Sequence, residues 1–149
     1  MIRQAELSDL DAVLPLVRGY REFYQREHDA PAEREFIARH LREGTSTMFV
    51  AWHERRAVGF VQLFRTWSTV RLGPAFVLED LFVEPEARGS GIVDALLERA
   101  LAFARECGAT GMFLETAQDN ERAQHVYDRN GWKRESRFLK YNAPLAEEM

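Results

Sequence analysis

The sequence predicts a single mixed α/β (α+β) domain that spans residues 1–149, and three observations support this prediction. The chain is 46% hydrophobic and 30% charged, which is typical of one globular domain. Short β-type runs and amphipathic stretches follow one another in the order β-α-α-β-β-β-α-β-α-β, with a further strand left open at the end. A glycine-rich turn also joins a strand to the strongest helix, as in α/β proteins that bind phosphate groups.

The composition argues against several classes of protein. The formal charge is −4, from 24 acidic and 20 basic residues, so nonspecific binding to nucleic acid is not expected. No run approaches the ~20 apolar residues of a membrane span. Charged residues also interrupt the first segment, so a signal peptide is not expected there. The single cysteine, Cys107, cannot form an internal disulfide, which favours a cytoplasmic protein. The four histidines lack zinc-ligand spacing, so no metal is expected.

The first half of the chain predicts one strand, two helices and a hairpin. Met1–Ala5 is expected to form a short strand, and Ser8 to cap the first helix. A second helix is expected to begin near Pro31 and to end by Gly44. Two strands then flank a polar turn at residues 53–56, and they are expected at Met48–Trp52 and Ala57–Arg65.

The second half carries the remaining elements. Residues 67–74 are interpreted as a loop, and Ala75–Val83 as a strand. The strongest helix follows the glycine-rich turn and continues to Cys107, where Gly108 stops it. A strand, a helix and one or two final strands complete the chain, and they are expected at Gly111–Thr116, Asn120–Arg129 and Trp132–Asn142.

The most informative segment is the glycine-rich turn at residues 83–94. A strand stops near Pro85, Arg88-Gly89-Ser90-Gly91 follows, and a helix begins. The first N–H groups of a helix have no partner within it, so glycines there let an anionic diphosphate approach the backbone. The alternative is a turn that merely connects strand to helix. A dinucleotide-binding turn fits poorly because Asp94 replaces its third small residue, and no Gly-Lys-Ser/Thr of a Walker loop follows.

Three linked motifs resemble the GNAT superfamily of acyl-CoA-dependent N-acetyltransferases. Residues 88–93 (Arg-Gly-Ser-Gly-Ile-Val) resemble the family pattern Q/R-x-x-G-x-G/A, Val83–Pro85 precedes them, and Asn120-x-x-Ala123-x-x-x-Tyr127-x-x-x-Gly-Trp follows. The overlap covers about residues 48–133. The resemblance implies a central mixed, mostly antiparallel sheet flanked by about four helices. It also implies acetyl transfer from acetyl-CoA to a primary amine by direct attack on the thioester. Residues 78–83 (Leu-Glu-Asp-Leu-Phe-Val) look most like the diamine (spermidine/spermine) acetyltransferase branch.

The resemblance also implies how acetyl-CoA is held. One strand would pair its backbone with the pantetheine arm, the helix amides would hold the pyrophosphate, an arginine would add a cation, and an asparagine would bind the arm. The residues implied are Leu81, Phe82, Val83, Arg88, Gly89, Ser90, Gly91, Ile92, Val93, Asp94 and Asn120.

Two of these positions depart from the family pattern. Val93 stands where the family has Gly or Ala, and Asp94 places a carboxylate near the expected phosphates. We therefore hypothesise modest cofactor affinity. The alternative for Asp94 is a purely local role, since an acid in a first helical turn suits the helix dipole.

Acetyl transfer to an amine requires a proton acceptor and a proton donor, because the amine arrives protonated. The resemblance implies Tyr127 as the general acid and Glu79 as the base, acting directly or through water, with Glu115 in reserve. Strand alternation predicts Glu79, Leu81 and Val83 on one face and Leu78, Asp80 and Phe82 on the other. Adjacent acids inside an apolar strand are costly to bury, which favours a cleft. The alternative is structural hydrogen bonding by one or both carboxylates.

For the acceptor, the resemblance favours Asp80, beside Glu79, as the residue that holds a cationic amine. Tyr24 and Glu27 lie in the region where the family places the acceptor. The aromatic side chains of that region can instead belong to the core, and its acids to a solvated face. We expect a small-molecule amine substrate, and a homodimer is compatible with the resemblance. The alternative functions are a protein or peptide acetyltransferase and a non-catalytic CoA-binding module.

Overall fold

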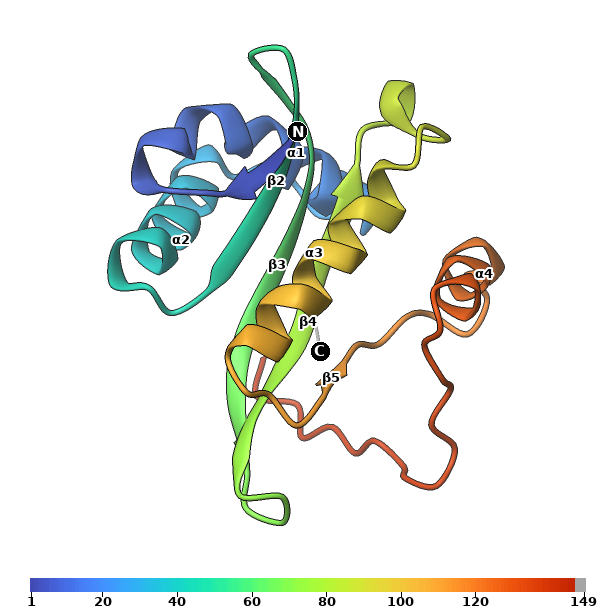
Figure 1. The fold of residues 1–149 in the computed structure, drawn as a ribbon. Helices are drawn as coiled ribbons and strands as arrows, with labels where there is room; N and C mark the ends of the chain where they lie inside the picture. Colours follow the sequence, from blue (N-terminus) through green and yellow to red (C-terminus); the bar gives the residue numbers. More distant parts are fainter. Residues whose placement is uncertain (147–149) are drawn as a thin grey trace. The chain divides into compact units, whose positions relative to one another are not determined.

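The computed structural model describes residues 1–146 and divides the chain into two compact units, residues 1–115 and the residues from Thr116 on (Figure 1). Among the described residues, the first unit contains five strands, three helices and two short 3-10 turns, and the second contains one helix. In chain order the elements are β1 (Ile2–Gln4), a 3-10 turn (Leu7–Asp9), α1 (Leu10–Phe23), α2 (Ala30–Glu43), β2 (Thr47–His53), β3 (Arg56–Ser68), β4 (Gly73–Val83), a 3-10 turn (Pro85–Ala87), α3 (Ile92–Glu106), β5 (Met112–Phe113) and α4 (Glu121–Arg129).

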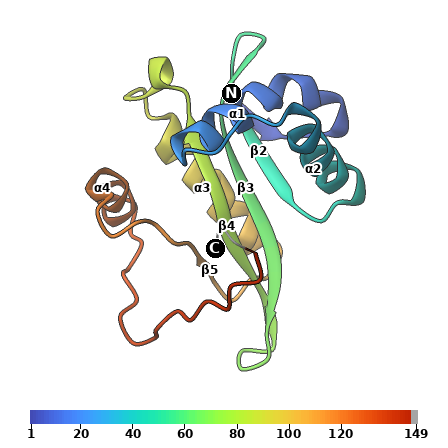
Figure 2. The same ribbon diagram turned by 180° about the vertical axis from the view of Figure 1, so that it is seen from behind.

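The five strands form one mixed sheet in the order β1-β2-β3-β4-β5. Neighbours are antiparallel, except that β5 runs parallel to β4. Helices α1 and α2 cover one face of this sheet and α3 covers the other, as the two opposite views show (Figures 1 and 2). The mixed, mostly antiparallel sheet and the four helices confirm the fold class predicted from the sequence. None of the helices within residues 1–146 is both long and apolar enough to cross a membrane.

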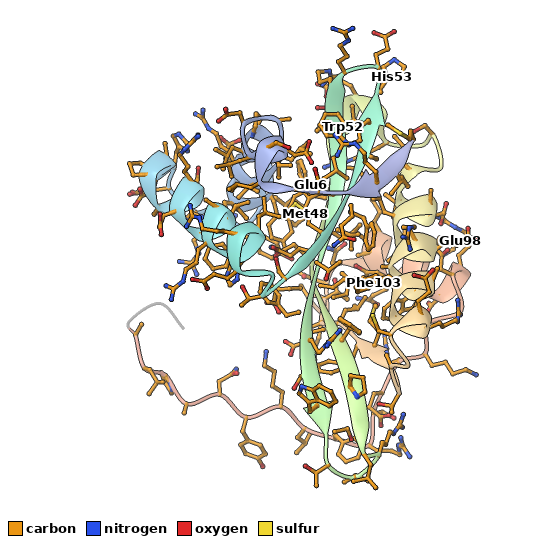
Figure 3. All side chains as sticks on the ribbon, turned by 60° about the vertical axis from the view of Figure 1, so that its left-hand side comes forward. Glu6, Met48, Trp52, His53, Glu98 and Phe103 are labelled. Carbon is orange, nitrogen blue, oxygen red and sulfur yellow. The ribbon has the colours of Figure 1, made fainter. Side chains whose placement is uncertain are left out.

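Apolar side chains on both faces of the sheet hold the helices in place. On one face, Phe103 of α3 packs edge-on against Phe49 and Phe76, with ring centroids 5.5 Å apart in each pair. On the other face, Met48 belongs to a buried cluster with α1 residues such as Val13. Figure 3 labels Phe103 and Met48 on these two sides of the strands. Both faces of the central strands are therefore core, so a polar side chain there requires a specific partner.

A β-bulge in β4 corrects the predicted alternation of that strand. Gln62 of β3 lies opposite Asp80, but its neighbour Leu63 lies opposite Leu78, so Glu79 is an extra residue. Leu78 lies on the α3 face with Phe76, whereas Asp80 and Phe82 lie on the α1 face. Leu78 therefore does not share a face with Asp80, because the bulge reverses the alternation between them.

Two boundaries in the first unit also differ from the predictions. Asp9, rather than Ser8, occupies the N-cap of α1, but its side chain makes no capping bond to that helix; its carboxylate accepts hydrogen bonds from Arg3 and from the Glu6 N–H. Half of the expected loop at residues 67–74 is strand, since β3 continues to Ser68 and β4 begins at Gly73. The intervening turn is short, and the backbone there is closed by the Ser68 hydroxyl accepting from the Arg71 N–H.

The end of the chain contains less strand than predicted. β5 covers Met112–Phe113 alone, rather than the whole of Gly111–Thr116. The expected strands at Trp132–Asn142 are wrong for the described residues, since 132–146 contain no strand. Phe138 and Tyr141 in this segment are 75% and 87% exposed. The alternation of apolar residues is a local signal, but a strand also needs a hydrogen-bonded partner, which a local pattern does not supply.

Candidate active site

The turn before α3 presents a helix start that its own N-cap residue does not cap. Gly91 is the N-cap and, as a glycine, supplies no side-chain capping hydrogen bond. The first bond of the helix runs from the Ala95 N–H to the Gly91 carbonyl, 3.1 Å away. The N–H groups of residues 92 and 93 therefore have no partner within the helix. These amides and the helix dipole make a site suited to an anion.

Both glycines of the turn are required by the backbone. Gly89 and Gly91 have φ values of +82° and +83°, a region that glycine adopts without strain. A Cβ atom built at either glycine would meet no other atom within 4 Å, so the space above this backbone is open. The turn has the backbone and the space that a diphosphate needs.

Arg88 and Ser90 shape the turn from within. The Arg88 Nε donates to the carbonyl of Val83, 2.9 Å away, and its guanidinium lies 5.7 Å from the centre of the Phe82 ring. The Ser90 hydroxyl donates to the carbonyl of Ala87. Arg88 thus ties the turn to the end of β4, and its terminal nitrogens extend from an exposed side chain. This bond was not foreseen from the sequence, which predicted Arg88 as a cation for phosphate alone.

The far half of β4 has an open edge. Among residues 1–146, β5 pairs with β4 only at Phe76 and Val77. The Glu84 N–H donates to the carbonyl of Val58 in β3, so the peptide groups of Glu84 face β3. Because peptide groups alternate along a strand, those of Leu81 and Val83 point away from β3, to the other edge of β4. That side can accept an extended chain as an added strand, while the Val83 carbonyl is already used by Arg88. The open edge leads from the glycine turn back to the bulge.

The two adjacent carboxylates at the bulge have different surroundings. The Glu79 side chain is exposed, and its backbone carbonyl accepts a hydrogen bond of 3.2 Å from the Tyr20 hydroxyl. The Asp80 carboxylate accepts a hydrogen bond of 2.7 Å from the Gln62 amide. Burial raises the pKa of Asp80, and the neighbouring charge of Glu79 raises it further, while the hydrogen bonds from Gln62 and Tyr20 oppose these effects. The burial and the neighbouring charge thus favour the protonated form of Asp80.

Tyr20 lies above these carboxylates. Its ring packs against Phe60 and Phe82 and meets Tyr24 with a centroid distance of 5.1 Å. Burial, followed by the negative charge of Asp80, raises the pKa of the Tyr20 phenol far above its ordinary value. Tyr20 therefore stays protonated at neutral pH and acts as a hydrogen-bond donor.

The structure brings some predicted acceptor residues together and separates others. Tyr24 caps the end of α1 and joins the aromatic group beside Asp80 through Tyr20. Glu27 lies in the exposed loop after α1, where its carbonyl accepts from Arg21 at 3.0 Å. Arg21 also binds Glu33, so this loop is tied to α2.

The sequence did not single out Gln62 and Ser46 as parts of the site. Gln62 is 1% exposed and bridges the Ser46 hydroxyl and the Asp80 carboxylate. A lone glutamine in the apolar run of residues 57–63 was an available signal, because a buried amide needs partners.

The second unit carries Asn120 and Tyr127. The Asn120 side chain caps α4, since its Oδ1 accepts from the Ala123 N–H at 3.1 Å. Its Nδ2 group is the part that can donate to a cofactor. Tyr127 lies in the last turns of α4 and its ring meets Trp132 with centroids 5.9 Å apart. The seven-residue spacing thus places the two residues at the start and near the end of one short helix.

Comparison with known proteins agrees with this architecture. The model of the acetyltransferase (GNAT) family matches residues 13–132. An uncharacterized N-acetyltransferase of Bacillus subtilis, YhfO, is 36% identical over 140 residues, which are 94% of each chain. A probable acetyltransferase of Haemophilus influenzae is 30% identical over 117 residues, covering 78% of this chain and 80% of that protein.

Solved structures give the same result. The crystal structure of a probable acetyltransferase superposes with a TM-score of 0.94 at 36% identity and covers 99% of both chains. An aminoglycoside N-acetyltransferase in complex with CoA has a TM-score of 0.83 at 22% identity, covering 96% of this chain and 93% of its own, and shows the shared fold. Because the family model spans most of the sequence and these relatives cover nearly all of it, the chain belongs to the GNAT family and is an N-acetyltransferase.

Proposed function

We propose that the protein transfers the acetyl group of acetyl-CoA to the primary amine of a small, cationic molecule. Membership of the GNAT family supports acetyl-CoA as the co-substrate. The observation that carries the proposal is a continuous arrangement within the first unit. The start of α3, the open edge of β4 and the Glu79–Asp80 pair follow one another along the backbone. We further propose that the whole chain acts as one domain and works in the cytoplasm.

Each part of this arrangement fits a part of acetyl-CoA. The amides of residues 89–94 would hold the pyrophosphate, with the Arg88 guanidinium adding a cation. The outward peptide groups of Leu81 and Val83 would pair with the pantetheine arm, and the Asn120 Nδ2 would donate to the same arm. The roles of Asn120 and Tyr127, which belong to the second unit, are proposed from their positions in the family motif.

The side chains then divide the chemistry among them. An alkylamine has a reference pKa of about 10.4 and must lose a proton before it attacks. Glu79 accepts that proton, directly or through one water, and Asp80 holds the cationic acceptor. The nitrogen lone pair forms the new C–N bond as the C–S bond breaks. Tyr127 donates its phenolic proton to the leaving sulfur, and the second proton of the attacking nitrogen restores the phenol, so a thiol and a neutral amide are produced.

The acceptor class follows from charge and shape. The Asp80 carboxylate beside the rings of Tyr20 and Tyr24 suits an ammonium group, since both carboxylates and aromatic faces attract cations. The aminoglycoside acetyltransferases of this fold act on amines of that kind, and the resemblance to the diamine branch supports the same class. The alternative is a peptide acetyltransferase, in which an open groove would receive the acceptor. It would carry out the same chemistry on a larger substrate.

An assay of thiol release from acetyl-CoA tests this proposal. The panel contains 1,4-diaminobutane, L-lysine, an aminoglycoside and a short peptide with a free amino terminus. We expect turnover with at least one small amine and little with the peptide. Turnover with the peptide alone would favour the peptide acetyltransferase. Binding of acetyl-CoA without turnover of any amine would favour the non-catalytic CoA-binding module and contradict the proposal.

Asp94 offers a prediction about cofactor affinity. A carboxylate in the first turn of α3 repels the expected pyrophosphate, so Asp94→Ser should bind acetyl-CoA about two- to fivefold more tightly at low salt. Val93→Gly should also tighten binding by removing a branched side chain near the helix start. Calorimetry measures both dissociation constants, and Glu98→Ser, one turn further along α3, is the matched control. Absence of a gain in both variants would contradict the hypothesis of repulsion and crowding.

A further inference from the structure

A chain of hydrogen bonds crosses the sheet beneath the acceptor side of the site. The Ser46 hydroxyl donates to the Gln62 Oε1 over 2.8 Å, and the Gln62 Nε2 donates to the Asp80 Oδ2 over 2.7 Å. Gln62 is 1% exposed, and its neighbours Val61 and Leu63 are fully buried. A buried amide without partners is costly, and these two hydrogen bonds offset the cost of placing a glutamine among apolar residues.

The series of hydrogen bonds from Ser46 through Gln62 to Asp80 runs in one direction when Asp80 is ionised. A carboxylate only accepts hydrogen bonds, so the Gln62 amide must present its NH₂ group to Asp80. Its oxygen then faces Ser46, whose hydroxyl donates to it. The Asp80 carboxylate thereby disfavours the flipped amide, which would set two oxygens against each other, and Ser46 supplies a matching donor to the amide oxygen. Gln62 is thus held as a donor for one specific carboxylate oxygen.

The groups around Asp80 leave its charge unbalanced. Gln62 from β3 and Tyr20 from α1 are neutral hydrogen-bonding partners, and Glu79 beside it in β4 carries a like charge. Tyr24, the C-cap residue of α1, packs against the ring of Tyr20 and is a further neutral aromatic group on this side. A largely buried carboxylate with neutral donors and a like-charged neighbour is stabilised by an incoming cation. The bulge at Glu79 turns Asp80 to this aromatic side of the sheet.

We infer that Gln62, whose amide oxygen accepts a hydrogen bond from Ser46, is a positioning residue that holds the Asp80 carboxylate as the anchor for the acceptor ammonium group. This inference rests on the proposed function, and it adds two residues that contact neither acetyl-CoA nor the reacting carbon. Gln62 fixes Asp80 Oδ2 and leaves the second carboxylate oxygen for the substrate. Ionised Asp80 is the form that binds the ammonium, so acceptor binding depends on pH.

The kinetic test uses Gln62→Met, which keeps a similar volume and removes the donor. We expect KM for the best amine of the panel to rise about 10-fold or more, because a hydrogen bond to a charged group is lost, with KM for acetyl-CoA unchanged. Removing a bond that lowers the pKa of Asp80 raises that pKa. The acidic limb of kcat/KM for the amine should therefore move to higher pH. Ser46→Ala should move the limb in the same direction by less, and Gln4→Met in β1 is the control.

A double-mutant cycle separates positioning from general stability. Asp80→Asn should raise the amine KM more than Gln62→Met does, and adding Gln62→Met to Asp80→Asn should change that KM little. Additive effects of the two substitutions, or an unchanged amine KM and pH limb in folded Gln62→Met, would overturn the inference. Thermal unfolding of each variant shows whether it is folded, and Ser46→Ala provides the test if Gln62→Met is not.

A binding measurement distinguishes failure of this inference from failure of the proposed function. The carboxyl carbons of ¹³C-labelled aspartate report the ionisation of Asp80, and n-butylammonium serves as the probe cation. We expect the probe to perturb the Asp80 signal in the wild type and to bind at least several-fold more weakly to Gln62→Met. Equal binding to both proteins would overturn the inference whether or not any amine is acetylated.

Discussion

Replacing Tyr127 with phenylalanine is expected to lower kcat by about 10²- to 10⁴-fold, the usual contribution of a positioned general acid. The substitution removes a single oxygen and keeps the ring, whose contact with Trp132 places it in the second unit. The dissociation constant of acetyl-CoA should therefore stay nearly unchanged. Single-turnover kinetics and calorimetry measure the two quantities separately.

Tyr141→Phe is the matched control for this experiment, because Tyr141 is 87% exposed and lies outside the motif that carries Tyr127. It should leave kcat unchanged. If Tyr127→Phe turned over the amine as fast as the wild type, Tyr127 would have no role as the acid.

Replacing Glu33 with alanine is expected to reduce the free energy of unfolding by about 3–5 kcal/mol, the cost of breaking a buried ion pair from one side. The Glu33 side chain is 5% exposed and binds Arg21, His28 and the backbone N–H of Asp29. Its loss leaves the Arg21 guanidinium without its buried partner and releases the loop between α1 and α2. Urea unfolding measures the change, and Glu35→Ala on the exposed face of the same helix should have little effect.

The same carboxylate makes stability depend on pH. Burial alone would raise the pKa of Glu33, but the hydrogen bonds from Arg21 and Asp29 and the nearby positive charges outweigh burial and lower it below 4.5. The unfolded chain then binds the proton more readily than the folded one. The contribution of Glu33 is present above about pH 4.5 and is lost as the pH falls through the lower pKa of the folded state. The unfolding free energies of the wild type and Glu33→Gln should converge as the pH falls through that range. A constant difference would contradict this origin.

The features that local chemistry determines were predictable from the sequence. Gly44 adopts a left-handed conformation and ends α2 where the glycine predicted a stop. The amphipathic stretch after Gly91 forms α3 from Ile92, and the glycine turn has the positive φ values that only glycine adopts freely. The turn at which we propose an anion site could be located from these residues because helix starts and glycine turns are encoded by neighbours in the chain.

The features that depend on distant partners were not predictable. The bulge at Glu79 arises from the register between β3 and β4, and it determines which face carries Asp80. The bond from Gln62 to Asp80 joins residues 18 positions apart. The apolar pattern after Trp132 predicted strands that the described residues do not form, because pairing decides strand formation. The adjacent carboxylates of Glu79 and Asp80 could be recognised as two acids inside an apolar strand. Their surroundings depend on this long-range geometry.

The central claim is that the backbone before α3 binds the diphosphate of acetyl-CoA, and calorimetry of that binding tests it most directly. Wild-type protein should bind acetyl-CoA and should bind acetyl-pantetheine, which lacks the diphosphate, at least 10-fold more weakly. Gly91→Val should lose most of this difference, because a side chain at φ +83° strains the turn and fills the open space above it. Absence of heat with any acyl thioester, or equal affinity of the wild type for both ligands, would contradict the account.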